Sequence, residues 1–286
     1  MTRLPLTVIS GYLGAGKTTL INRLLAEDHG LRLLVMVNDF GAINIDAALI
    51  ETSGDDTIAL TNGCVCCTMG ADLFMALGDA LDRRPRPDHL VIEASGIADP
   101  AAIANAAKAE PEMSYAGIVT LIDALNCADL LTDDLIAPQI AQQIQAADLK
   151  LLTKGQTPSD DLTQQLQAHD LSIPIPLPDG PLAPLVFGVT PLPNSRPTTT
   201  HPIYTHWNDP APDPLSRTQL ETKIQNRPDG LYRVKGFVSG PDGTFEIHCV
   251  GTHTEIRTSA TQAQGIVALG LADRISADQI ATWWTT

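Results

Sequence analysis

A glycine-rich segment near the start of the chain restricts the fold more than any other feature of the sequence. It reads Gly11-Tyr-Leu-Gly-Ala-Gly-Lys-Thr18 and fits the phosphate-loop pattern G-x-x-x-x-G-K-[ST]. A short apolar run precedes it at residues 6–10, and a helical pattern follows at 18–27. The segment therefore predicts a strand, a phosphate-binding loop and a helix. A glycine-rich turn with an incidental lysine is the alternative, and the agreement of pattern and context argues against it.

Each residue type in this loop has a chemical role. Glycines allow the backbone to fold around a phosphate group, with its N–H groups at the positive end of the following helix. The lysine is expected to contact the β and γ phosphates, and the threonine after it to offer a hydroxyl to Mg²⁺. The predicted nucleotide-binding residues of this segment are Gly11, Gly14, Ala15, Gly16, Lys17, Thr18 and Thr19.

The first two-thirds of the chain alternates apolar, β-rich runs with helical stretches. The predicted strands are 6–10, 33–37, 90–94, 119–123 and 149–153, and the predicted helices are 18–27, 71–82, 101–109 and 136–147. Strands that are apolar at consecutive positions and separated by helices are typical of parallel sheets buried on both faces. This pattern predicts an α/β fold with a doubly wound, mostly parallel sheet of the P-loop NTPase type.

The amino-acid composition changes beyond residue 173. The stretch 173–214 is rich in Pro and Thr and is not expected to form helix. Its end, near 194–200, predicts a linker, so that residues 1–193 form the nucleotide domain and 194–286 a second one. The second domain is expected to be small and α+β, with strands at 203–206, 231–238, 244–250 and 253–258 and a helix at 214–225.

Acidic residues follow two of the predicted strands. Glu93 ends a buried strand and Gly96 stands three residues later, the layout of a Walker B strand and second switch, in which Gly96 N–H could meet a γ-phosphate. Glu93 is expected to hold Mg²⁺ through a water or to orient the attacking water. Asp39 brings another carboxylate to the same edge, and Asp46 follows on a loop. The alternative is that these acids merely end strands in solvent.

Three thiols lie within four residues between these acidic segments. Cys64, Cys66 and Cys67 form a C-x-C-C motif that starts after a glycine. Thiolates suit Zn²⁺, Cu(I) or Co²⁺, and three ligands leave one coordination position open, as a metal-transfer site requires. The alternative for a free cysteine is a small buried hydrophobic residue, which is the expectation for the isolated Cys127 and Cys249.

Charge and composition exclude several classes of partner. The chain has 286 residues, with 18 Lys and Arg against 33 Asp and Glu, a formal charge of -15 that repels nucleic acid and anionic lipid. No apolar run approaches the length of about 20 residues that crosses a bilayer. Five cysteines, an odd number, suit thiols in a reducing compartment. We expect no nucleic acid partner, no membrane, and a cytoplasmic location.

Taken together, these motifs make the chain resemble the CobW-like family of metal-chaperone P-loop GTPases. The likeness runs through GYLGAGKTTLINRLL, VNDFGAINIDAALI, LTNGCVCCT, HLVIEASGIADP and VTLIDALN, returns weakly at LYRVKGFV, and covers some two-thirds of the chain. The resemblance implies GTP hydrolysis coupled to delivery of zinc or cobalt to a client metalloprotein, with the C-x-C-C thiolates as ligands. A nucleotide-dependent homodimer is a further expected partner. The implied fold is similar to that of nickel-insertion GTPases.

Two departures from the family pattern qualify this reading. Where the family usually has Asn- or Thr-Lys-x-Asp to read the base, this chain has Thr153, Lys154, Gly155 and Gln156. A Gln amide offers one neutral oxygen where Asp accepts from two guanine donors, so the guanine preference is open. The chain also has no His-rich tract, and its seven His are scattered.

Two other functions compete with a GTPase metallochaperone. One is a metal-binding regulatory module in which the nucleotide stabilises the fold without significant turnover. The other is a small-molecule kinase, which needs a basic lid over the transferred phosphoryl group. The tight basic cluster Arg83, Arg84 and Arg86 lies at the end of a predicted helix, before a strand, which argues against a lid.

Overall fold

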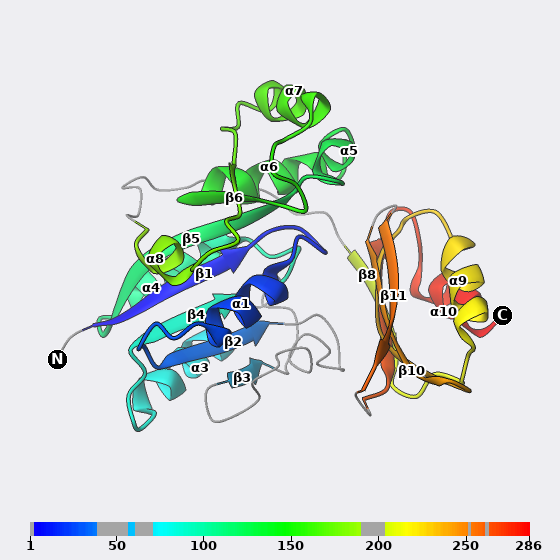
Figure 1. Ribbon diagram of the computed structural model, residues 1–286, viewed down its shortest axis with the longest axis horizontal. Coiled ribbons are helices and arrows are strands. Elements are labelled where there is room, and N and C mark those ends of the chain that lie inside the picture. Colours follow the sequence, from blue (N-terminus) through cyan, green and yellow to red (C-terminus); the bar gives the residue numbers. More distant parts are fainter. Residues whose placement is uncertain (1–2, 39–56, 61–70, 190–203, 251–252, 261–262) are drawn as a thin grey trace. The chain divides into compact units, whose positions relative to one another are not determined.

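The computed structural model describes residues 3–38, 57–60, 71–189, 204–250, 253–260 and 263–286. The described residues belong to two compact units, one before residue 190 and one after residue 203 (Figure 1). The predicted linker at 194–200 lies outside the described residues, so the domain boundary after residue 193 stays a prediction.

A seven-stranded sheet forms the centre of the first unit, in the order β3-β2-β4-β1-β5-β6-β7. Its strands are β1 (Leu4–Ser10), β2 (Leu33–Asn38), β3 (Thr57–Leu60), β4 (His89–Glu93), β5 (Met113–Asp123), β6 (Leu149–Thr153) and β7 (Ile175–Pro176). Each neighbouring pair is parallel. The chain places β2 to β4 on one side of β1 and β5 to β7 on the other. At such a switch point the carboxyl ends of the strands open a crevice where ligands bind.

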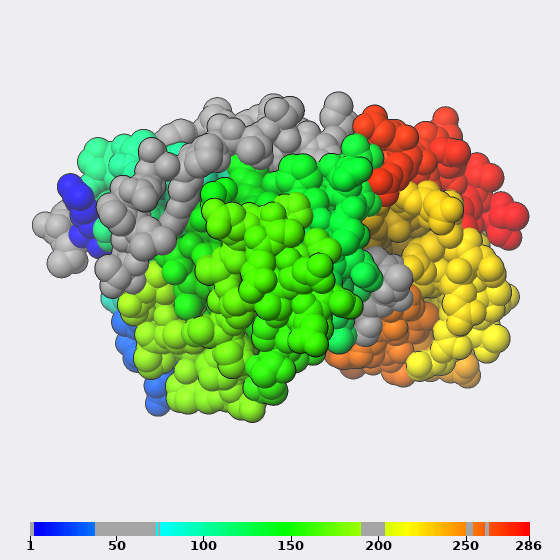
Figure 2. Space-filling model, turned by 90° about the horizontal axis from the view of Figure 1, so that it is seen from above, coloured from blue at the N-terminus to red at the C-terminus, as the bar shows by residue number. Residues whose placement is uncertain are grey.

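Helices cover both faces of this sheet. They are α1 (Lys17–Ala26), α3 (Ala71–Asp82), α4 (Pro100–Ala109), α5 (Cys127–Leu131), α6 (Ala137–Ala146), α7 (Asp160–Ala168) and α8 (Ala183–Phe187). In β1, Leu6 and Val8 pack in one core with α3 and α4, whereas Ile9 packs in a second core with α1 and α8. The segment from α5 to α8, in green and yellow-green, forms much of the surface of this unit in Figure 2. The predicted doubly wound parallel sheet is confirmed.

The prediction that residues 173–214 contain no helix is wrong at α8. Pro184 stands in the first turn of α8, where a backbone N–H has no partner within the helix. The carboxylate of Glu27, just past α1, accepts hydrogen bonds from the N–H groups of Leu182 (2.6 Å) and Ala183 (2.9 Å). Proline is thus tolerated and the helix start is capped by a residue far away in the sequence, which local composition does not reveal.

The second unit has a five-stranded antiparallel sheet in the order β11-β10-β9-β12-β8. Its elements are β8 (Tyr204–Asp209), α9 (Arg217–Gln225), β9 (Leu231–Gly240), β10 (Gly243–Val250), β11 (His253–Ser259), β12 (Gly265–Leu271) and α10 (Ala277–Thr285). Residues of α9 and α10 share one core with the sheet, so the α+β prediction is confirmed. Within the described ranges, no helix is long and apolar enough to cross a membrane.

Side-chain capping explains where the helices of this unit begin. The predicted helix at 214–225 starts at Arg217 because Ser216 is its N-cap. Ser216 Oγ accepts from Gln219 N–H, and the Gln219 side chain accepts from Ser216 N–H at 2.8 Å, a capping box. The same box at Ser276 starts α10, a helix that the sequence analysis missed together with β12.

A buried histidine makes the stability of the first unit depend on pH. His89, at the start of β4, is 4% exposed. Its Nε2 lies 2.8 Å from Thr7 Oγ1 and its ring centroid 4.3 Å from that of Phe187. Burial, with a smaller contribution from His29, lowers the pKa of His89 to about 4. The folded chain therefore favours the neutral ring, whereas in the unfolded chain the imidazole of His89 binds a proton below about pH 6.5.

We expect this histidine to stabilise the fold above about pH 6.5 and to lose that contribution as the pH falls to about 4, a change of about 3 kcal/mol. His89→Gln keeps a polar partner for Thr7 but does not titrate. The free energy of unfolding of wild type and variant, followed in urea by circular dichroism at both ends of this range, should differ in its pH dependence by that amount. Equal pH dependence in the two proteins would show that His89 is not responsible.

Candidate functional site

The phosphate loop joins the carboxyl end of β1 to the start of α1, at the switch point of the sheet. Gly11, Gly14 and Gly16 have positive φ angles of 137°, 74° and 95°. A Cβ on Gly11 would stand 2.6 Å from the carbonyl oxygen of Leu121 on β5, so a side chain at this position would collide with the neighbouring strand. The loop ends at the N-terminus of α1, the positive end of the helix dipole.

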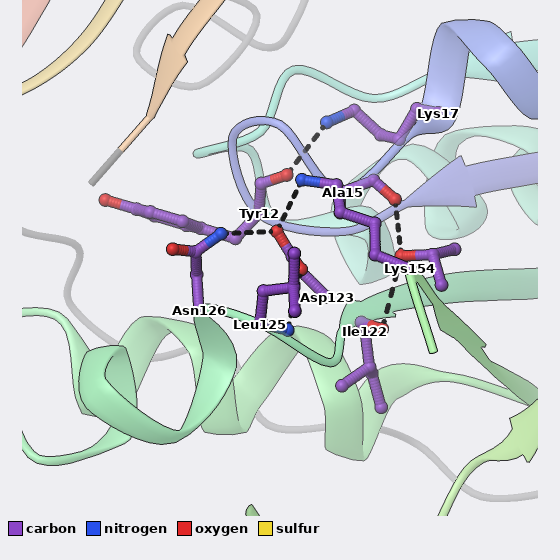
Figure 3. A network of polar contacts seen from close by, with 9 residues as sticks. Tyr12, Ala15, Lys17, Ile122, Asp123, Leu125, Asn126 and Lys154 are labelled. Atoms are coloured by element: carbon purple, nitrogen blue, oxygen red, sulfur yellow. Dashed lines mark hydrogen bonds and ion pairs between the residues drawn. The ribbon is translucent and has the colours of Figure 1, made fainter. Parts of the chain in front are cut away.

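Lys17 is folded over this loop. It is 7% exposed, and its ammonium donates a hydrogen bond to the carbonyl oxygen of Gly11 at 2.8 Å. It also donates to the carbonyl oxygen of Tyr12 at 3.3 Å (Figure 3). Thr18 follows as a half-buried residue and Thr19 as an exposed one. The predicted phosphate-binding residues thus form one continuous turn, with the lysine charge held at the loop by backbone oxygens.

The structure brings Thr18 and Glu93 together. The hydroxyl of Thr18 donates to Glu93 Oε1 at 3.1 Å and lies 3.4 Å from Oε2. Glu93 is 3% exposed and pairs in register with Ile9, just before the phosphate loop. A hydroxyl and a carboxylate are hard oxygen ligands of the kind that Mg²⁺ prefers. The residues present therefore fit the ion that the sequence analysis predicts here.

Gly96 packs directly on the phosphate loop. A Cβ at this position would stand 2.6 to 2.9 Å from three atoms of Leu13, among them its backbone nitrogen and Cα. Backbone atoms move aside only if the loop itself moves, so a glycine is required at this close approach. The segment expected to sense the γ-phosphate is therefore in contact with the loop expected to bind it.

The predicted base-reading segment is also anchored to the phosphate loop. Thr153, at the end of β6, donates from Oγ1 to the carbonyl oxygen of Ala15 at 2.9 Å, and Oγ1 also lies 3.3 Å from the carbonyl oxygen of Ile122. The hydroxyl thus links the predicted base-reading segment to the phosphate loop.

Asp123 and Asn126 are two residues of this region that the sequence analysis did not predict. Asp123, 6% exposed at the end of β5, accepts from the ammonium of Lys154 at 2.7 Å and from the Asn126 amide at 2.8 Å. Lys154 has a positive φ of 59°, and Gln156 is exposed. A carboxylate that ends a buried strand beside β1 was the available signal, since parallel strands bring their carboxyl ends to one edge.

The predicted metal ligands Cys64, Cys66 and Cys67 lie outside the described residues, as does Asp39. In the part of the chain that the structure describes, no group of three or more His, Cys, Asp or Glu side chains could hold a metal ion. The C-x-C-C site stays a prediction.

Cys127 and Cys249 are free and buried, as predicted. Burial, and secondarily the Asp123 carboxylate, raises the pKa of the Cys127 thiol to about 12. This cysteine is a packed thiol without thiolate character.

Comparison with known protein families shows to which family the chain belongs. The CobW/HypB/UreG nucleotide-binding domain matches residues 5–173, more than half of the chain. The chain belongs to the CobW/HypB/UreG family. The C-terminal domain of cobalamin synthesis protein cobW matches residues 206–284, so both units have counterparts in one family.

Several curated proteins are similar to this member of the family. Zinc chaperone CobW of Sinorhizobium sp is 40% identical over 135 residues, 44% of this chain and 38% of that protein. Zinc chaperone YjiA of Escherichia coli K12 is 36% identical over 162 residues, 54% of this chain and 50% of that protein. The chain thus spans half or less of the curated relatives that it matches.

A solved structure also matches. The crystal structure of Zn(II)-bound YjiA GTPase from E. coli covers 100% of this chain and 99% of that one, at 21% sequence identity and a TM-score of 0.43. The family assignment rests on the sequence matches.

Proposed function

We propose that the protein is a GTP-hydrolysing metallochaperone, which binds a transition metal through its C-x-C-C motif and delivers it to a client protein or cofactor pathway. The observation that carries the nucleotide half is the contact of Thr18 with the buried Glu93 beside the phosphate loop. Family membership and the names of its relatives support the metal half. Besides the zinc chaperones, a zinc-regulated GTPase metalloprotein activator of Dictyostelium discoideum is 36% identical over 148 residues.

The nucleotide chemistry follows from the arrangement of these side chains. Lys17 exchanges its bonds to the Gly11 and Tyr12 carbonyls for bonds to phosphate oxygens, which are charged and stronger acceptors. Thr18 and Glu93 would hold Mg²⁺, which neutralises phosphate charge when bound. We assign to Glu93 and Asp39 the orientation of the attacking water.

The base is assigned to the segment from Thr153 to Gln156. Thr153 bonds this segment to the phosphate loop, and the ion pair of Lys154 with Asp123 bonds it to the end of β5. An exposed Gln156 replaces the family's acidic residue, so we propose only a modest preference for GTP over ATP.

Zinc is the cargo that the names of the relatives favour, with cobalt as the second candidate. Thiolates of Cys64, Cys66 and Cys67 leave one coordination position for a ligand from the client. The motif stands in sequence between Asp39 and Gly96, the residues proposed to respond to the γ-phosphate. Nucleotide binding would then alter the metal site. Thiols kept reduced point to the cytoplasm, and a nucleotide-dependent homodimer is among the proposed partners.

A linkage measurement tests this function. Zn²⁺ and Co²⁺ are titrated into the reduced protein without nucleotide, with GDP and with a non-hydrolysable GTP analogue, while GTP and ATP turnover are measured separately. We expect GTP to change the metal affinity by a factor of about 5 to 150, and metal to change GTP affinity by the same factor, because coupling is reciprocal. Identical metal affinities in the three states, without turnover, would favour the regulatory module instead.

A further inference from the structure

Helix α6 buries an unusual number of amide side chains. Gln139, Gln142 and Gln143 are 1%, 5% and 1% exposed, whereas Gln145 on the same helix is exposed. Glutamine is mostly a surface residue, and a buried polar side chain is stable only where it is hydrogen-bonded. The partners of these amides therefore reveal why α6 is polar on its inner side.

Two of these amides donate to the same short loop. Gln143 Nε2 lies 3.0 Å from the carbonyl oxygens of both Gly96 and Ala98, and Gln139 Nε2 donates to the carbonyl oxygen of Ile97. Three consecutive carbonyls of the loop after β4, the proposed γ-phosphate sensor, are thus bound by one helix.

These bonds determine the orientation of the peptide groups in the loop. A peptide unit is planar, so a carbonyl directed at α6 also directs the N–H of the next residue, here those of Ile97, Ala98 and Asp99. The N–H of Gly96 belongs to the Ser95 peptide, whose carbonyl accepts from Ala98 N–H at 2.9 Å and therefore depends on the glutamine bonds through Ala98. From the opposite side, Leu13 of the phosphate loop contacts Gly96 so closely that no side chain fits there. The loop is therefore held between α6 and the phosphate loop.

The side-chain amide oxygen of Gln143, Oε1, is buried without a hydrogen-bond partner. Flipping the amide would place this oxygen against the carbonyls of the loop, acceptor against acceptor. The side chain is thus used for its donors, and an apolar residue at this position would avoid the penalty of an unpaired acceptor.

The helix is tied to the rest of the nucleotide site as well. The hydroxyl of Thr120 on β5 donates to the backbone oxygen of Gln143 at 3.1 Å. The chain then passes directly from α6 into β6, which ends at Thr153 and its bond to Ala15. The position of α6 thus depends on the strands that carry the base-reading segment.

We propose that Gln139 and Gln143 are positioning residues that hold the loop at residues 94–99 ready for the γ-phosphate, and so set how strongly the site prefers GTP to GDP. This inference rests on the proposed function, because it takes Gly96 as the sensor. GDP has no γ-phosphate and does not contact the loop. Loss of the glutamine donors therefore weakens GTP binding selectively.

The test compares Gln143→Met, which keeps length and volume but has no donor, with Gln145→Met on the exposed side. Calorimetry with a non-hydrolysable GTP analogue and with GDP gives the ratio of the two dissociation constants. Gln143→Met is expected to lower the preference for the GTP analogue about tenfold or more, and Gln139→Met, which loses the bond to the Ile97 carbonyl, by about threefold to tenfold. Gln145→Met should match wild type. Amide exchange of residues 94–99 should quicken in Gln143→Met but not in Gln145→Met.

Equal weakening of both nucleotides by Gln143→Met, or an unchanged ratio, would overturn the positioning role and leave a structural one. If Gln143→Met does not fold, as judged by circular dichroism, Gln139→Met decides on the same criteria. A wild-type protein that binds the GTP analogue and GDP equally would instead overturn the proposed γ-phosphate sensor and this inference with it. If only the positioning role of Gln139 and Gln143 is wrong, the result is different. Wild type then prefers the GTP analogue to GDP, and the variants show the same preference.

Discussion

Replacing Lys17 with alanine is expected to abolish nucleoside triphosphate binding. The ammonium is buried at the phosphate loop, and two backbone carbonyls already direct it there. Hydrogen bonds to charged groups contribute about 1.5 to 3 kcal/mol each. Two such bonds to phosphate correspond to a loss of affinity of about 10² to 10⁴-fold.

Calorimetry with a non-hydrolysable GTP analogue measures this loss. Lys108→Ala is the matched control, since Lys108 is an exposed lysine at the end of α4 that lies over the ring of Tyr115. The control should bind as wild type does, and circular dichroism should show both variants folded. An unchanged dissociation constant for Lys17→Ala would remove the phosphate-loop assignment, and with it the nucleotide half of the proposed function.

Replacing Cys64, Cys66 and Cys67 together with serine is expected to remove the metal and its coupling to nucleotide, while GTP binding stays intact. A serine hydroxyl is a poor substitute for a thiolate at Zn²⁺ or Co²⁺. The loss of zinc affinity should be on the order of 10³-fold or more, because all the proposed protein ligands are removed at once. None of the three residues is proposed to touch phosphate.

Competition with a chromophoric chelator under reducing conditions measures the zinc affinity, and calorimetry measures GTP binding. Cys127→Ala is the control, because Cys127 is not one of the proposed ligands and burial raises the pKa of its thiol to about 12, which disfavours the thiolate that binds metal. Unchanged zinc stoichiometry in the triple variant would refute the C-x-C-C site and leave the GTPase assignment standing.

Much of the fold follows from local patterns that the sequence displays openly. The buried strands β1, β2, β4 and β6 coincide with apolar runs, because parallel strands covered on both faces need hydrophobic residues at consecutive positions. The missed helix α10 also had a local signal, the capping box at Ser276 and Gln279. The helix α8 had none, since its cap is Glu27, which lies just past α1 and far away in the sequence.

The candidate site divides in the same way. The residue types of the phosphate loop, and Glu93 at the end of a buried strand, could be predicted because they belong to continuous motifs. The partnership of Asp123 with Lys154, and that of Gln143 with the loop at Gly96, could not. Each joins residues on different elements, and no periodicity or spacing in the chain relates them.

The sequence by itself determined that this chain builds a parallel α/β unit with a phosphate loop, and that a small α+β unit follows. These predictions rest on local signals, namely hydrophobic periodicity, glycines and capping residues. Each acts over a few neighbouring positions and can be recognised in the sequence alone. Only the tertiary structure decided that Thr18 meets Glu93, that Thr153 meets Ala15, and that buried glutamines of α6 bind the loop after β4. These contacts depend on strand order and on the close packing of helices against the sheet, which place side chains within about 3 Å only after the whole unit has folded.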